Sequence, residues 1–158
     1  YGFLEAGVSE VRVINRSAGR AEELQRHFGP RVKTFPIAAF AAASADVSVL
    51  VNTTTLGMAG IDDVEADLGG LRADCVVADI VYVPLETGLL KRARGRWLKT
   101  VDGLGMLLHQ AVPGFEKWFG VKPEVTAELR ALIAADIEAA HSSAHGSGHG
   151  PGHGAGRG

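Results

Sequence analysis

The chain has 158 residues, about the size of one globular domain. Hydrophobic residues make up 46% and charged residues 22%, and these ordinary values exclude a wholly disordered or fibrous chain. The formal net charge is -2, so no basic surplus argues for a nucleic-acid partner. No apolar run approaches the roughly 18 residues of a membrane span, so we expect no membrane partner.

The single cysteine, Cys75, excludes an internal disulfide framework and a cysteine-rich zinc site. A lone thiol fits a reducing compartment, and we expect a cytoplasmic protein. The amino end lacks the basic and apolar regions of a secretory signal peptide. Because the chain begins with Tyr1 and not with Met, we expect it to be a piece of a longer or processed protein.

Strand-like and helix-like runs alternate along residues 1–140. Short runs rich in β-branched residues predict strands over 11–14, 47–51, 75–78 and 98–101. Apolar periodicity and capping residues predict helices over 1–7, 17–28, 85–94, 104–119 (interrupted near Pro113) and 125–140. This alternation indicates an α/β fold with a mainly parallel, helix-covered sheet.

Residues 141–158 differ in composition from the rest of the chain, because they hold four of the six histidines and seven of the 21 glycines. We expect a disordered Gly/His-rich tail here. A flexible metal-binding tail is the alternative, since neutral imidazoles suit zinc, nickel or copper. Flexible histidine-rich chains bind such metals without a dedicated site, so we assign no metal ligand.

Polar residues follow four of the predicted strands. They are Asn15-Arg16, Asn52 to Thr55, Asp79 with Tyr82, and Asp102-Gly103. Ligands of parallel α/β sheets bind at the carboxyl ends of the strands, so these residues predict one continuous binding edge. Ordinary polar loops after strands are the alternative.

The segment after the first strand carries two arginines. In a dinucleotide-binding fold, an acidic residue at this place binds the ribose 2′-hydroxyl of NAD. Asn15 and Arg16 stand there instead, and a guanidinium attracts a 2′-phosphate that a carboxylate would repel. Arg20 lies one helical turn further on, and Ser17 begins the helix, where free N–H groups favour anions. The segment predicts NADP rather than NAD, with a solvated basic helix start as the alternative.

Side chains suited to a cleft also occur later in the chain. Tyr82 can project its hydroxyl into the cleft mouth, although an ordinary half-buried tyrosine is equally consistent with the sequence. Gly103, at a helix start, lets a ligand approach the backbone closely. Met106 and Gln110 are four residues apart and share a helix face. Gln110 offers both donors and an acceptor, which suits a polyhydroxylated ligand.

Four motifs occur in order and at suitable spacing. They are Asn15-Arg16-Ser17, Asn52-Thr53-Thr54, Asp79…Tyr82…Pro84…Thr87, and Asp102-Gly103-Leu104-Gly105-Met106…Gln110. Together they resemble the carboxyl-terminal NADP-binding domain of shikimate dehydrogenase, over about residues 1–138. The last motif is the most specific, because related proteins such as glutamyl-tRNA reductase share an Asn-Arg segment but are not expected to share this helix.

The resemblance implies an incomplete Rossmann-like parallel sheet with helices on both faces, forming a partial NADP-binding domain over residues 1–140. It implies an oxidoreductase that reversibly reduces 3-dehydroshikimate to shikimate with NADPH, in aromatic amino-acid (chorismate) biosynthesis. The cofactor-binding residues that it implies are Asn15, Arg16, Ser17, Arg20, Thr53, Ile80, Gly103 and Met106. Tyr82 and Gln110 are implied to reach the substrate.

The resemblance also identifies what this chain lacks. The family's catalytic Lys and Asp lie in an amino-terminal substrate domain that nothing here matches, and residues 1–10 contain no Gly-rich diphosphate loop. We therefore assign no catalytic residue. We expect the isolated chain to be inactive and to bind NADP weakly, because hydride transfer needs a proton donor and an oriented substrate.

Several alternatives stay open. A quinate/shikimate dehydrogenase is the nearest, but some of these prefer NAD and carry an acidic residue where Arg16 stands. A truncated, non-catalytic nucleotide-binding module and a metal-handling protein are the others. The expected partner is a small-molecule substrate, and the resemblance is compatible with a homodimer.

Overall fold

The computed structural model describes residues 1–146, with side chains as far as His141. The chain divides into two compact units. The first unit comprises Tyr1–Leu50, Glu65–Val77 and Arg92–Lys99. The second comprises Val51–Val64, Ala78–Lys91 and Thr100–Gly158. Each unit is described by itself.

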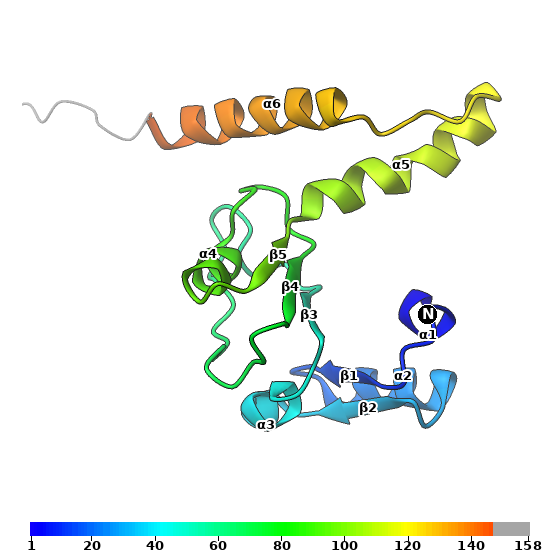
Figure 1. Cartoon of the computed structure of the whole chain (residues 1–158), viewed down its shortest axis with the longest axis vertical. Helices are drawn as coiled ribbons and strands as arrows, with labels where there is room; N and C mark the ends of the chain where they lie inside the picture. Colours follow the sequence, from blue (N-terminus) through cyan, green and yellow to red (C-terminus); the bar gives the residue numbers. More distant parts are fainter. Residues whose placement is uncertain (147–158) are drawn as a thin grey trace, which may run out of the picture. The chain divides into compact units, whose positions relative to one another are not determined.

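A β-α-β arrangement forms most of the first unit. Strands β1 (Val11–Ile14) and β2 (Val32–Phe35) pair in parallel, with Val11 opposite Val32 and Ile14 opposite Phe35. Helix α2 (Ala18–Phe28) joins them and packs against β2 (Figure 1). A parallel pair needs such a crossover, because its strands run in the same direction. The short helix α1 (Gly2–Glu5) precedes β1.

Helix α2 ends where the sequence predicts. The backbone of Gly29 has φ 81°, and its N–H donates to the carbonyl of Gln25 at 2.9 Å. Glycine adopts this positive φ at little cost, and Pro30 lacks the N–H that would continue the helix. Ala21 and Val32, which are 2% and 3% exposed, form the buried contact surface of α2 and β2.

An ion-pair cluster lies beside β1. The Arg12 guanidinium binds Glu10 at 2.6 Å and Asp46 at 2.6 Å, and it also donates to the carbonyl of Ala43 at 2.9 Å. Lys33 on β2 binds the second carboxylate oxygen of Glu10. The cluster ties β1 to β2 and to helix α3 (Phe40–Ser44), which follows the 3-10 turn η1 (Ile37–Ala39).

A three-stranded sheet has the order β3 (Val49–Asn52), β4 (Val76–Asp79), β5 (Lys99–Val101) (Figure 1). The backbone N–H of Val76 donates to Ser48, and that of Ile80 donates to Asn52. Both partners advance by four residues, so β3 and β4 are parallel and their carboxyl ends share one edge. Helix α4 (Gly88–Gly95) connects β4 to β5.

Two longer helices complete the second unit. Helix α5 (Gly103–Phe119) begins directly after β5, and helix α6 (Ala127–Gly146) follows it. Helix α5 is continuous through Pro113, so the predicted interruption there is wrong. Proline removes one N–H from the ladder, but the turns on either side still form.

The α/β class with parallel strands is confirmed, and all four predicted strands are present within two residues of their expected bounds. Strand β2 and the segment η1–α3 were not predicted. Helix α6 continues to Gly146, and the boundary of the Gly/His-rich tail at 141 stays a prediction. Residues 147–158 of that tail lie outside the described part of the chain.

Candidate functional site

An Asn or Asp side chain closes a turn after four of the strands. In each case its Oδ1 accepts a hydrogen bond from the backbone N–H two residues ahead. The pairs are Asn15 with Ser17 (3.2 Å), Asn52 with Thr54 (3.0 Å), Asp79 with Val81 (3.0 Å) and Asp102 with Leu104 (3.1 Å). Short side chains of this kind favour turns because they bond their own backbone locally. The polar residues at the predicted edge thus fix backbone shape, whatever else they bind.

The first unit carries the residues that are predicted to bind the 2′-phosphate of NADP. Asn15 follows β1, and Ser17 is the N-cap residue of α2, with an extended backbone (φ -95°). The Ser17 hydroxyl makes no capping bond, so it stays available to a ligand. Arg16 and Arg20 are exposed, and neither guanidinium has an ion-pair partner in the described part of the chain. Two unneutralised cations at a helix start suit an anion.

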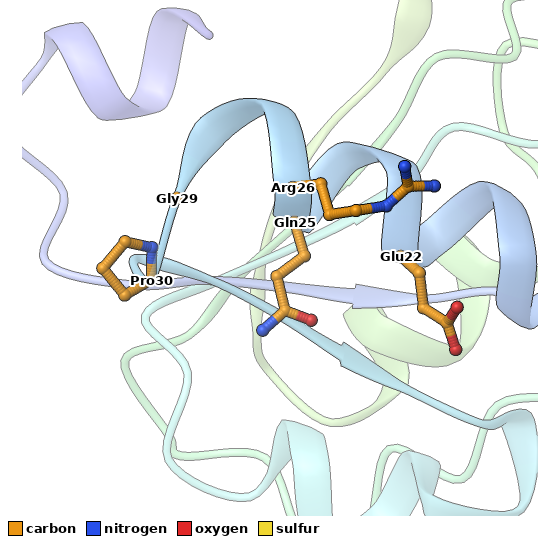
Figure 2. A pocket seen from close by; sticks show the side chains of 5 residues that line it. All are labelled: Glu22, Gln25, Arg26, Gly29 and Pro30. Carbon is orange, nitrogen blue, oxygen red and sulfur yellow. The ribbon is translucent and has the colours of Figure 1, made fainter.

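The same helix bears an open surface hollow at its other end. Figure 2 shows its lining side chains, Glu22, Gln25, Arg26, Gly29 and Pro30. None of them belongs to the predicted site. Glu22 and Arg26 carry opposite charges, so the hollow offers no concentration of one charge for an ionic ligand.

In the second unit, a buried polar network supports the polar residues that follow β3 and β4. Asp79, at the end of β4, is 2% exposed. Its Oδ1 accepts from Asn52 Nδ2 at 2.9 Å and from the Val81 N–H, and its Oδ2 accepts from Thr87 Oγ1 at 2.7 Å. Thr87 is fully buried just before α4, and its hydroxyl accepts from the Leu90 N–H at 3.4 Å. Buried polar groups need such partners to offset the loss of water.

The Asn52 side chain shapes the loop after β3. Its Nδ2 also donates to the carbonyl of Leu56 at 3.0 Å, and its Oδ1 accepts from the Thr54 hydroxyl at 2.8 Å. The predicted cofactor residue Thr53 lies between these anchored positions and is exposed. The loop therefore presents Thr53 on a backbone that is held from both sides.

The ends of β4 and β5 meet at Gly103. A Cβ added there would lie 2.3 Å from the carbonyl oxygen of Ile80 and 2.6 Å from that of Val81. Only glycine permits so close an approach. Asp102 caps α5 through Leu104, and its second oxygen binds the guanidinium of Arg130 on α6. The structure thus brings together Ile80 and Gly103, both of which the resemblance implies as cofactor-binding residues.

The remaining predicted residues face solvent. Tyr82 is 38% exposed, three residues beyond the end of β4. Met106 is 42% exposed, and Gln110 lies one turn further along α5 and is also exposed. Within the part of the chain that the structure describes, no hydrogen bond occupies the Tyr82 hydroxyl or the Gln110 side-chain amide. Both polar groups remain free to bind a ligand.

Metal-binding clusters and membrane-spanning helices can be assessed for residues 1–146. Across the residues that the structure describes, His, Cys, Asp and Glu nowhere gather in a group of three that could hold a metal ion. In the same part of the chain, no helix combines the length and apolar character that crossing a membrane requires.

Comparison with known proteins finds similarity to one family. The model of the shikimate 5′-dehydrogenase C-terminal domain matches residues 103–133, which begin at the first residue of α5. A shikimate dehydrogenase (NADP(+)) of Azorhizobium caulinodans is 56% identical over 133 residues, which are 84% of this chain and 47% of that protein. These matches confirm the resemblance to shikimate dehydrogenases.

Solved structures agree with this family and with a Rossmann-like fold. Quinate dehydrogenase from Corynebacterium glutamicum, in complex with NAD, is 31% identical with a TM-score of 0.75, covering 85% of this chain and 49% of that one. Shikimate 5-dehydrogenase from Thermus thermophilus, in complex with NADP(H) and shikimate, is 28% identical with a TM-score of 0.64, covering 89% and 48%. The chain spans about half the length of the curated relatives that it matches.

The connection from Thr87 to Asp79 is the part of this edge that sequence reasoning missed. Both residues belong to the Asp79…Tyr82…Pro84…Thr87 motif, but the sequence assigns Asp79 only to the polar edge and gives Thr87 no role. Their signal is a buried-looking strand that ends in Asp, followed eight residues later by a Thr at a helix start. A Thr hydroxyl at that place either caps its helix or reaches back to the carboxylate, and here it does both.

Proposed function

We propose that this chain is the NADP-binding portion of a shikimate dehydrogenase, which reversibly reduces 3-dehydroshikimate to shikimate with NADPH. The observation that carries the proposal is the start of α5. The family model begins there, and Gly103 lies against the Ile80 carbonyl at the sheet edge. A relative that is 56% identical over most of this chain bears the same activity in its name.

Each group of residues has a role in the proposal. Arg16 and Arg20, with Asn15 and Ser17, bind the adenosine 2′-phosphate through charge-assisted hydrogen bonds. In the second unit, Thr53 and Met106 line the cofactor, while the backbone of Ile80 and Gly103 contacts the nicotinamide. Tyr82 and Gln110 reach the substrate, which has hydroxyl and carboxylate groups to receive them. NADPH supplies the hydride when bound.

The catalytic Lys and Asp of the family have no counterpart in this chain, so the isolated chain is expected to be inactive. A hybrid protein tests the proposal. The chain would replace the matching half of the Azorhizobium caulinodans enzyme, and NADPH oxidation would be followed with 3-dehydroshikimate. A folded hybrid without activity would contradict the proposal. Shikimate-dependent NADPH formation by the chain alone would contradict its inactivity.

Cofactor preference separates the two nearest candidates. The NAD complex of the quinate dehydrogenase is the observation that favours a quinate/shikimate enzyme. The exposed Arg16 and Arg20 favour NADP instead, because a 2′-phosphate supplies the missing anion. In the hybrid, Arg16→Ala should raise the KM for NADPH about tenfold or more and leave that for NADH nearly unchanged. Arg26→Ala, on the same helix, is the matched control and should change neither.

A further inference from the structure

We propose that Asp79, held by Thr87, is a positioning residue that fixes the backbone of Ile80 and Val81 against Gly103, and thereby the nicotinamide end of the cofactor site. This inference rests on the proposed function for the identity of the ligand. The positioning itself rests on contacts that all lie within the second unit. Neither residue touches the cofactor in this assignment.

The Asp79 residue is 2% exposed, and both oxygens of its carboxylate accept hydrogen bonds. It receives three hydrogen bonds, each from a different part of the chain: the Asn52 amide after β3, the Val81 backbone after β4, and the Thr87 hydroxyl before α4. A buried carboxylate is tolerated only when such donors replace its hydration. Oδ1 has two of these donors, whereas Oδ2 has only the Thr87 hydroxyl. Loss of that hydroxyl therefore leaves Oδ2 without a partner, and the other contacts must rearrange to compensate.

The contacts of Asp79 act on the turn that follows it. The bond from Val81 N–H to Oδ1 closes the turn over residues 79–81, and the Ile80 N–H is held by the Asn52 carbonyl at 3.1 Å. The carbonyl of Ile80 then lies so close to Gly103 that no methyl group fits between them. A small rotation of this turn would therefore move the Ile80 carbonyl and alter the surface that Gly103 and Ile80 share.

Thr87 is the residue through which the proposal is best tested, because its hydroxyl can be removed with little change of volume. In Thr87→Val, the Val81 amide should exchange its hydrogen on the order of tenfold faster, as expected for one lost buried hydrogen bond. Saturation-transfer NMR with NADP+ should show the nicotinamide signals reduced at least about threefold relative to the adenine signals. Thr87→Ser, which keeps the hydroxyl, should restore both readouts.

Thr126→Val is the matched control, because the Thr126 hydroxyl caps the start of α6 through the Leu129 N–H at 3.2 Å. It makes the same chemical change at another helix start and should leave the Val81 amide and the nicotinamide signals as they are. Unchanged exchange at Val81 in folded Thr87→Val would overturn the positioning role. Should that variant fail to fold, Thr87→Cys, with its weak S–H donor, should show intermediate exchange, and wild-type exchange there would equally overturn it.

The two readouts separate this proposal from the function on which it rests. If the unaltered chain shows no saturation transfer from NADP+, the proposed cofactor is wrong for this chain, yet exchange at Val81 still decides whether Asp79 and Thr87 position the turn. If NADP+ binds and exchange responds, but the nicotinamide-to-adenine ratio is constant, the turn does not set the nicotinamide end and the inference fails.

Discussion

Replacement of Gly103 by alanine should destabilise the second unit. The added Cβ would lie 2.3 Å from the Ile80 oxygen and 2.5 Å from the Ile80 carbonyl carbon, whereas ordinary contact begins at 3.4 Å. All the atoms it meets are backbone, so α5 or the turn after β4 must shift by roughly 1 Å. Overpacking of this kind costs about 1–3 kcal/mol of unfolding free energy.

The same helix supplies the control. Gly105 has open space around its Cα, with nothing within 4 Å of an added Cβ. Inside a helix, alanine is more favourable than glycine by about 0.5–1 kcal/mol, so Gly105→Ala should raise the unfolding free energy. The two variants make the same chemical change and should move stability in opposite directions.

Thermal melting and urea titration of both variants measure the difference. For a chain of this size, each kcal/mol corresponds to about 2–4 °C in the melting temperature. Gly103→Ala should therefore melt several degrees below the unaltered chain, and Gly105→Ala slightly above it. If Gly103→Ala melts at or above the temperature of Gly105→Ala, the close approach of α5 to Ile80 does not exist in solution.

Three further predictions concern stability and reactivity. Trp97 has φ 61° and is 93% exposed. Trp97→Gly should raise the unfolding free energy by about 0.5–1 kcal/mol, because glycine suits the left-handed conformation and little packing is lost. Urea titration measures this change, and a lower unfolding midpoint for the variant would contradict it. Burial raises the pKa of the Cys75 thiol, so a thiol reagent at pH 8 should label it only after unfolding, and rapid labelling of the folded chain would show that it is accessible. The Arg12 guanidinium lowers the pKa of Asp46 below its usual 3.8, and Lys33 with Arg12 lowers the pKa of Glu10 below 4.5. The ion pairs therefore stabilise the folded state fully above these usual values. This stabilisation is lost as pH falls through the lowered pKa values, where the two carboxylates become protonated. In Arg12→Gln, the urea concentration at the unfolding midpoint should therefore fall less steeply as pH drops below about 4.5. The same steepness as in the unaltered chain would refute this role of Arg12.

The elements that the sequence predicted well are those with strong local signals. Val11–Ile14 is a β-branched run bounded by polar residues, and α2 is bounded by Ser17 and Gly29, so both appear where expected. Strand β2 was missed because Val32–Phe35 includes Lys33 and no long apolar run. Its pairing with β1 and the Glu10–Lys33 contact stabilise it, and neither can be read from a local window.

The candidate site also contains residues that the sequence indicates locally and residues whose role depends on tertiary contacts. Motif reading identified Gly103, and the structure supplies its reason in the Ile80 carbonyl. Tyr82 and Gln110, which the resemblance implies at the substrate, are both exposed, and their substrate contact stays a prediction. The eight-residue spacing of Asp79 and Thr87 is visible in the sequence, but the hydrogen bond between them depends on the start of α4 lying against the end of β4, which is a tertiary contact.

Pro113 makes α5 less stiff at one point along its length than elsewhere. Proline has no N–H, so the carbonyl of His109 receives no ladder bond at that point, although the helix is continuous. The first turn of α5 is clamped by Asp102 and Gly103, whereas Trp118, beyond the proline, is 80% exposed. Bending should therefore concentrate at 109–113, so that the part of the helix beyond Pro113 moves relative to its first turn.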